Sequence, residues 1–170
     1  MKKVKVLKTL LDFFWYTTIV GTFTVAIIFV FVIISEDSFK TSIDIFGEKI
    51  IPSPQETILL ILLSLILLGS IFNALFNLRK LIALFDKCII FDNQNIRFLK
   101  NIGTSLMFTA LLILILIIAG NYILLNNGVL KGSFPFGYIF LTAISGLFFL
   151  VLSEVFNIAK MTKEENDLTI

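Results

Sequence analysis

Apolar residues fill four long stretches of this chain, and short polar segments separate them. Each stretch reaches the roughly 20 residues that a helix needs to cross a hydrocarbon core about 30 Å thick. Helices satisfy their own backbone N–H and C=O groups, which lipid cannot do. The pattern therefore predicts an all-α polytopic membrane protein with four transmembrane helices, spanning residues 13–35, 56–78, 103–126 and 136–159. The segments between them are too short for a soluble domain, so residues 1–170 form one membrane domain.

The segment between the second and third spans, residues 79–102, is polar but keeps a helical pattern. Leu81, Ile82 and Phe85 continue the spacing of the second helix beyond its apolar stretch, so this helix should project further. Asp92 then stands where an N-cap residue would, with a carboxylate able to accept from free amides. The pattern predicts a helical loop in which the third helix already begins.

The polar segment between the first two spans, residues 36–56, alternates apolar and polar positions in SIDIFGEKI. This alternation predicts a short hairpin that turns near Gly47. We expect Ser53 or Pro54 just before the start of the second helix. We interpret this segment as a connector.

The distribution of positive charge indicates the orientation in the membrane. Of the 14 Lys and Arg residues, only Lys40, Lys49 and Lys131 would lie outside if the N-terminus lies inside. Positive residues collect on the cytoplasmic side of membrane proteins. The sequence therefore predicts an N-in, C-in topology, with residues 79–102 and the C-terminal tail 160–170 in the cytoplasm.

Composition narrows the classes of protein that remain. The chain is 58% hydrophobic with a mean hydropathy of +1.00, which a soluble fold of 170 residues could not bury. It has no histidine and a single cysteine, Cys88, which excludes an internal disulfide and leaves no common general base or Cys-cluster metal site. Since no H-E-x-x-H or G-x-S-x-G motif is present either, we expect no enzyme, no metal and no cofactor.

Two residues near the start of the third helix are candidates for a special role. Asn95 can bond loop backbone or a neighbouring helix end, or it can contact a ligand or partner. Gly103 allows another helix to approach closely, or it acts as a hinge. Both alternatives remain open from the sequence.

Glu154 is the acidic residue that lies clearly inside a span. Ionisable groups at that depth are costly and suggest a function with a charged partner. Arg79 and Arg97 should lie near the same boundary, so we expect an intramembrane ion pair with one of them. This pair either anchors the helices or belongs to an ion relay.

The arrangement F-x-x-x-N-x-x-x-L-x-x-x-G, formed by Phe91, Asn95, Leu99 and Gly103, resembles the central signature of the DUF2975 family of small bacterial four-helix membrane proteins. The ending EENDLTI, residues 164–170, is similar to the ending of many members. The resemblance implies a location in the bacterial cytoplasmic (inner) membrane. It also implies a gene context, because such proteins are frequently encoded beside small helix-turn-helix regulators. We therefore treat the signature, together with Asp92, as an expected interaction site.

Two functions remain after these observations. The first is a non-enzymatic regulatory or interaction protein whose cytoplasmic face docks a small DNA-binding regulator, with a tail that orders on binding. The second is a small transporter, or a lipophilic-ligand or peptide-resistance protein that uses the helix core. The lipid bilayer is an expected partner, and a homo-oligomer stays open. Topology and lipid attraction explain the basic residues, so we expect no direct contact with nucleic acid.

Overall fold

The computed structural model describes residues 2–34, 42–87, 92–129 and 134–167. Four helices account for most of them: α1 (Lys2–Ile34), α2 (Pro54–Asp86), α3 (Asn93–Asn126) and α4 (Phe136–Asp167). All four are long and apolar enough to cross a membrane. The predicted all-α class with four membrane-spanning helices is therefore confirmed.

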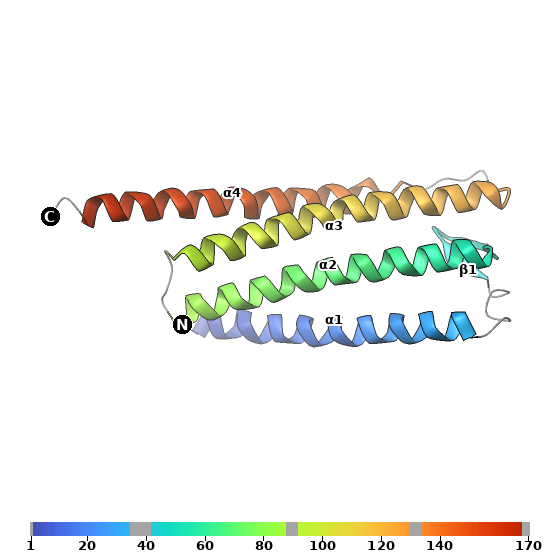
Figure 1. Ribbon diagram of the computed structural model, residues 1–170, viewed down its shortest axis with the longest axis horizontal. Coiled ribbons are helices and arrows are strands. Elements are labelled where there is room, and N and C mark those ends of the chain that lie inside the picture. Colours follow the sequence, from blue (N-terminus) through green and yellow to red (C-terminus); the bar gives the residue numbers. More distant parts are fainter. Residues whose placement is uncertain (1, 35–41, 88–91, 130–133, 168–170) are drawn as a thin grey trace.

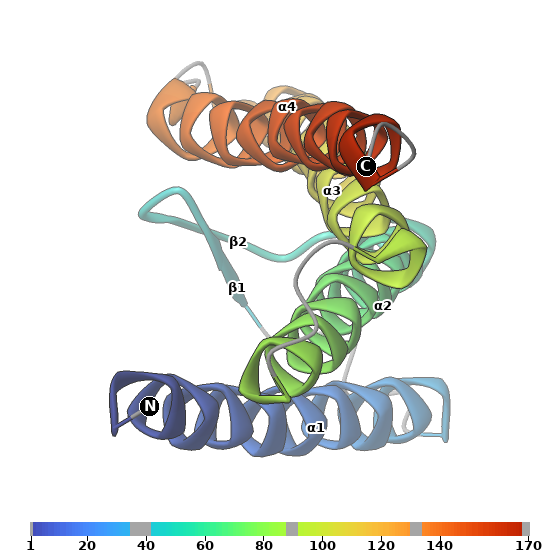
Figure 2. The ribbon, with the colours of Figure 1, turned by 90° about the vertical axis from the view of Figure 1, so that its left-hand side faces the viewer.

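The helices lie side by side in the order of the chain, as Figure 1 shows. Contacts are concentrated between sequence neighbours, α1 with α2, α2 with α3 and α3 with α4. The end view in Figure 2 places α1 and α4 at opposite edges, with α2 and α3 between them. The result is an open bundle, in which α3 is enclosed on two sides and α1 on one.

The two ends of the bundle differ in what they carry (Figure 1). One end, called here the termini end, carries the first residues of α1 and α3 and the last residues of α2 and α4. The opposite end carries a two-stranded antiparallel hairpin, β1 (Ile43–Ile45) and β2 (Glu48–Ile50), and is called the hairpin end. Both chain termini and the α2–α3 connection therefore share one end of the molecule.

The hairpin forms where the alternating pattern predicts it. Phe46 and Gly47 make its two-residue turn with φ values of 54° and 88°, a left-handed geometry that glycine adopts readily. The Gly47 N–H donates to Asp44 Oδ1 at 2.8 Å, which closes the turn. Ile45 and Ile50 then pack on the end of α3 near Ile123 and Leu124.

The starts of α2 and α3 are built differently. Ser53 caps α2 through a capping box with Glu56, as its position before the helix predicts. Asp92 occupies the N-cap position of α3, but the expected side-chain cap is wrong, since its carboxylate makes no cap hydrogen bond. The Asp92 backbone carbonyl instead accepts from the N–H groups of Asn95 at 3.0 Å and Ile96 at 3.3 Å. Those amides therefore already have an acceptor.

The predicted helical loop over residues 79–102 is the end of one helix and the start of another. Residues 79–86 complete α2, and residues 93–102 are the first turns of α3. The tail also differs from expectation, because α4 continues without a break to Asp167. Residues 160–167 are thus already helical, and the proposed ordering of this part on binding is wrong.

Candidate functional site

The signature residues of α3 form one stripe at the termini end. Asn95, Leu99 and Gly103 are four residues apart, so they share a helix face, and all three are buried. Leu99 packs in a cluster with Leu81 of α2 and Phe156 of α4. Asn95 is fully buried at 0% exposure, so its amide faces protein and cannot contact a ligand without rearrangement. Phe91 lies outside the described residues.

Gly103 marks the closest approach of α3 and α4. A Cβ atom at this position would lie 2.6 Å from Leu150 Cγ and 2.9 Å from the carbonyl oxygen of Gly146. A Cβ on Gly146 would in turn lie 3.0 Å from the backbone nitrogen of Met107. Two glycines facing each other allow the helix backbones to pack closely in lipid. This geometry supports the packing role of Gly103.

Glu154 does not meet the expected arginines within the described part of the chain. The preceding residue, Ser153, faces α3 and donates from Oγ to the carbonyl of Ile96 at 2.9 Å. One residue further along a helix is a rotation of about 100°, and the side chain of Glu154 is exposed on the outer face of α4. Among the described residues, the expected ion pair of Glu154 with Arg79 or Arg97 is therefore not formed.

Arg79 instead connects α2 to α1. Its Nε lies 2.9 Å from Asp12 Oδ1, and its guanidinium lies over the ring of Trp15 at 5.7 Å from the centroid. Trp15 also packs on Phe72, with ring centroids 4.2 Å apart. The sequence reasoning missed this role of Asp12, although an acid beside the first apolar run and an arginine ending the second were visible signals.

A ladder of hydroxyl and amide groups joins α2 to α3 within the apolar region. Ser70 Oγ donates to the carbonyl of Ser105 at 3.0 Å and lies 2.8 Å from Thr109 Oγ1. Asn73 Nδ2 donates to Ser105 Oγ at 3.1 Å. Ser70 lies about 15 Å along α2 from Lys80, near mid-membrane depth. Such interhelical hydrogen bonds hold helices together where lipid offers no partner.

The ladder continues toward the termini end through two further amides. Asn77 Nδ2 donates to Asn73 Oδ1 at 2.9 Å, and Asn101 Nδ2 donates to Asn77 Oδ1 at 3.4 Å. Beyond Asn77 and Asn101 come the cationic side chains of Lys80 and Arg97, which border the same hollow. Arg97 thus lies beside α2, on the side of α3 away from the buried stripe.

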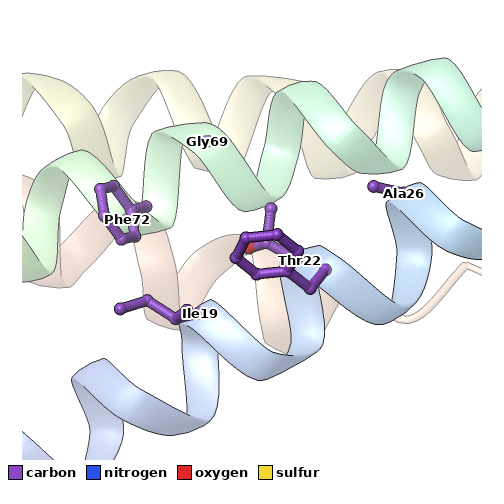
Figure 3. Close-up of a pocket in the computed structure, with 6 residues that line it drawn as sticks. Ile19, Thr22, Ala26, Gly69 and Phe72 are labelled. Atoms are coloured by element: carbon purple, nitrogen blue, oxygen red, sulfur yellow. The ribbon is translucent and has the colours of Figure 1, made fainter.

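An apolar groove separates α1 from α2 beyond the Trp15 contact (Figure 3). Its volume is about 470 Å³, and the lining side chains come from both helices: Ile19, Thr22, Phe23, Ala26, Gly69 and Phe72. The hydroxyl of Thr22 is already bonded to the carbonyl of Thr18 in its own helix. The groove therefore presents a mainly apolar surface, and the Thr22 hydroxyl at its border already donates to an acceptor in its own helix.

The model of the family described as a protein of unknown function, DUF2975, matches residues 12–170. The chain belongs to the DUF2975 family. The match covers nearly the whole chain, so all four helices are part of the DUF2975 architecture. No curated protein and no solved structure matches the chain. Membership of DUF2975 brings an architecture, while the activity has to be argued from the site.

A metal site at the termini end would need several ligand side chains close together. Within the described ranges no group of three or more His, Cys, Asp or Glu side chains lies close together. Some of the charged groups there form ion pairs, such as Lys160 Nζ with Glu164 Oε1 at 3.2 Å. Lys160 also donates to Asn93 Oδ1 at 2.7 Å, which ties α4 to the start of α3. The termini end of this DUF2975 member is therefore a charged surface on which α3 and α4 are joined by a hydrogen bond.

Proposed function

We propose that this protein is a non-enzymatic regulatory or interaction protein of the bacterial cytoplasmic membrane. Its termini end would dock a small soluble DNA-binding regulator of the helix-turn-helix type. The observation that carries the proposal is the last part of α4, residues 161–166, in which every side chain is exposed. Six consecutive helical residues cover all faces of a helix, so this segment presents exposed side chains in every direction.

The projecting part of α4 has the features of a docking helix. Lys160 is level with Asn93 at the start of α3, and the helix then runs on to Asp167, about 10 Å further. Lys163, Glu164 and Glu165 place both charge signs on it, a pattern that gives specificity and fast association more than raw affinity. The packed cluster around Leu99 supplies a rigid base.

The orientation required by this proposal is the predicted one. The starts of α1 and α3 and the ends of α2 and α4 lie at one end of the bundle (Figure 1), and the charge distribution predicts that this end lies in the cytoplasm. A soluble regulator would meet α4 there without crossing the membrane. The gene context implied by the family resemblance supports a regulator of this size and class.

Membrane fractionation tests the proposal directly. A helix-turn-helix regulator encoded beside the gene is expressed with and without the membrane protein, and its membrane-bound fraction is measured. We expect it to sediment with membranes only when the membrane protein is present. A photo-reactive residue at Lys163 should crosslink it, whereas the same residue at Lys49, at the hairpin end, should not. A regulator that stays soluble in both strains would refute the docking role.

The second candidate is a protein that binds or moves a lipophilic ligand. The observation in its favour is the apolar groove between α1 and α2 (Figure 3). Gly69→Leu would fill this groove, because a Cβ at Gly69 meets no atom within 4 Å. Gly137→Leu, at a position equally free of close neighbours on α4, is the matched control. If cells carrying Gly69→Leu keep the same resistance to lipophilic drugs and peptides, the groove has no such role.

A further inference from the structure

A shallow hollow of about 390 Å³ opens between α2 and α3 at the termini end. Its lining combines two cations, three amides and one aromatic ring: Lys80, Arg97, Asn77, Gln94, Asn101 and Phe98. None of these described lining residues is a carboxylate. Two neighbouring positive charges are complementary to an anion.

No described carboxylate forms an ion pair with the two cations of this hollow. Lys80 Nζ lies over the ring of Phe76, 4.0 Å from its centroid, and 5.9 Å from the centroid of Phe98. Such cation–π contacts hold an ammonium group in place and leave its charge intact. Throughout the described ranges, neither Lys80 nor Arg97 forms an ion pair. Arg79, one residue away in sequence, is by contrast paired with Asp12.

A second hollow, of about 320 Å³, lies deeper along the same helix pair. It is lined by small and polar residues with one exposed ring at its border: Gly69, Ser70, Asn73, Thr104, Ser105 and Phe108. Asn73 and Asn77 are one turn apart on α2 and hydrogen-bonded, so the two hollows follow one another. The order from the termini end inward is therefore cations, then amides and hydroxyls, then apolar helix surface.

This order corresponds to the order of groups in a phospholipid. The phosphate of a lipid lies at the membrane surface, its glycerol esters lie just below, and its acyl chains fill the core. Lys80 and Arg97 lie within about one helical turn of the uncharged parts of α2 and α3, at the depth of the headgroups. Basic pockets between transmembrane helices on the cytoplasmic side are known to suit anionic headgroups.

We propose that the α2–α3 groove is a binding site for an anionic phospholipid. Its phosphate lies between Lys80 and Arg97, its ester region lies near Asn73 and Thr104, and an acyl chain runs past Phe108. A lipid fits better than a soluble phosphate because the inner hollow lies along the uncharged parts of α2 and α3, where the exposed side chains of Thr104 and Phe108 would meet the bilayer. The site is independent of the proposed docking role, which uses the projecting part of α4.

Native mass spectrometry of the full chain tests this site. The protein is released from mixed micelles with equal amounts of phosphatidylglycerol and phosphatidylcholine, and the lipid it retains is counted. We expect wild type to retain phosphatidylglycerol preferentially. A basic residue near a membrane surface contributes roughly fivefold to the binding of anionic lipid, so Lys80→Gln with Arg97→Gln should lower retention about 25-fold.

The matched control removes the same charge at the same end. Lys100→Gln with Lys163→Gln neutralises two exposed cations outside the hollow and should change retention less than twofold. Lys80→Arg with native Arg97 should retain the lipid, and melting in detergent verifies that all variants fold. Equal retention of the two lipids by wild type, or an equal loss in the control variant, would overturn the site. Displacement of the lipid by millimolar inorganic phosphate would overturn a lipid as its ligand and leave a site for a soluble anion.

Discussion

The first and third helices are almost equally long and both are apolar, yet they differ widely in how many of their residues are buried. Twelve residues of α3 are buried. Among the side chains of α1 that the structure describes, only Leu11 is buried. Hydropathy does not predict which of these two helices is buried in the protein. Lipid is as apolar as a leucine side chain, so an apolar helix face can contact lipid or another helix.

The difference follows from small and hydrogen-bonding residues. The buried face of α3 contains Gly103, Ser105, Thr109 and Gly120, which allow close approach or bond to another helix. The hydroxyls of α1, such as that of Thr24, bond to carbonyls of their own helix. Without a hydrophobic force between helices in lipid, packing and interhelical hydrogen bonds decide which helix becomes central.

Replacing a glycine by alanine should give the largest difference in stability between α3 and α1, with the loss expected for Gly103→Ala in α3. The added methyl group would overlap Leu150 and the Gly146 carbonyl, and overpacking of this kind costs about 1–3 kcal/mol. Gly21→Ala in α1 meets no atom within 4 Å and should be neutral or slightly stabilising, because alanine favours helices more than glycine does. Thermal unfolding in detergent measures both. Equal melting temperatures for the two variants would contradict the central role of α3.

Trp15→Ala should release α1 while α2, α3 and α4 stay together. The change removes the stacking on Phe72 and the contact with Arg79, and an aromatic pair contributes about 0.5–1.5 kcal/mol beyond its buried area. Spin labels at the exposed positions Ile27 and Leu62, in a chain without the native cysteine, report the distance between α1 and α2. We expect a broader distance distribution.

Tyr16→Ala is the control for this change. Tyr16 is the next residue of α1 and is 62% exposed, so its removal should leave the distance distribution unchanged. An unchanged distribution with Trp15→Ala as well would mean that other contacts hold α1 in place.

A double-mutant cycle measures the coupling energy between Ser70 of α2 and Thr109 of α3. Ser70→Ala and Thr109→Val remove the two hydroxyls that lie 2.8 Å apart, and interhelical bonds of this kind contribute about 0.6 kcal/mol on average. We expect a coupling energy of that size in unfolding measurements. The pair Ser70→Ala and Thr24→Val should show none, since Thr24 bonds within α1. A coupling energy of similar size in both pairs would show that the hydrogen bond between Ser70 and Thr109 is not its source.

Asp12→Asn should have the smallest effect. The pair with Arg79 is partly exposed, with 30% and 41% of the two side chains accessible, and exposed ion pairs contribute about 0.2–1 kcal/mol. The loss should be measurable at low salt and vanish at high salt, because salt screens exposed charges. A loss that persists in high salt would show that Asp12 acts through something other than charge.

Part of the site could be read from the chain before folding. The resemblance to the DUF2975 signature singles out Asn95, Leu99 and Gly103, and all three are buried in the structure. The direction in which the side chain of Glu154 points could not be predicted from the sequence. Arg79 and Arg97 lie at a suitable depth, but only the rotation of α4 decides that Ser153 faces α3 and Glu154 faces outward.

The sequence by itself determined the number of membrane-spanning helices and the hairpin turn at Gly47. Those features depend on local chemistry, namely apolar length against the membrane thickness and the left-handed geometry of a tight turn. Tertiary structure alone decided which helix lies at the centre, that Arg79 pairs with Asp12, and that Lys80 and Arg97 border one hollow. These outcomes depend on how the helices rotate and approach one another. In lipid, apolar faces alone do not favour one arrangement over another, so small and hydrogen-bonding residues at the helix contacts decide it.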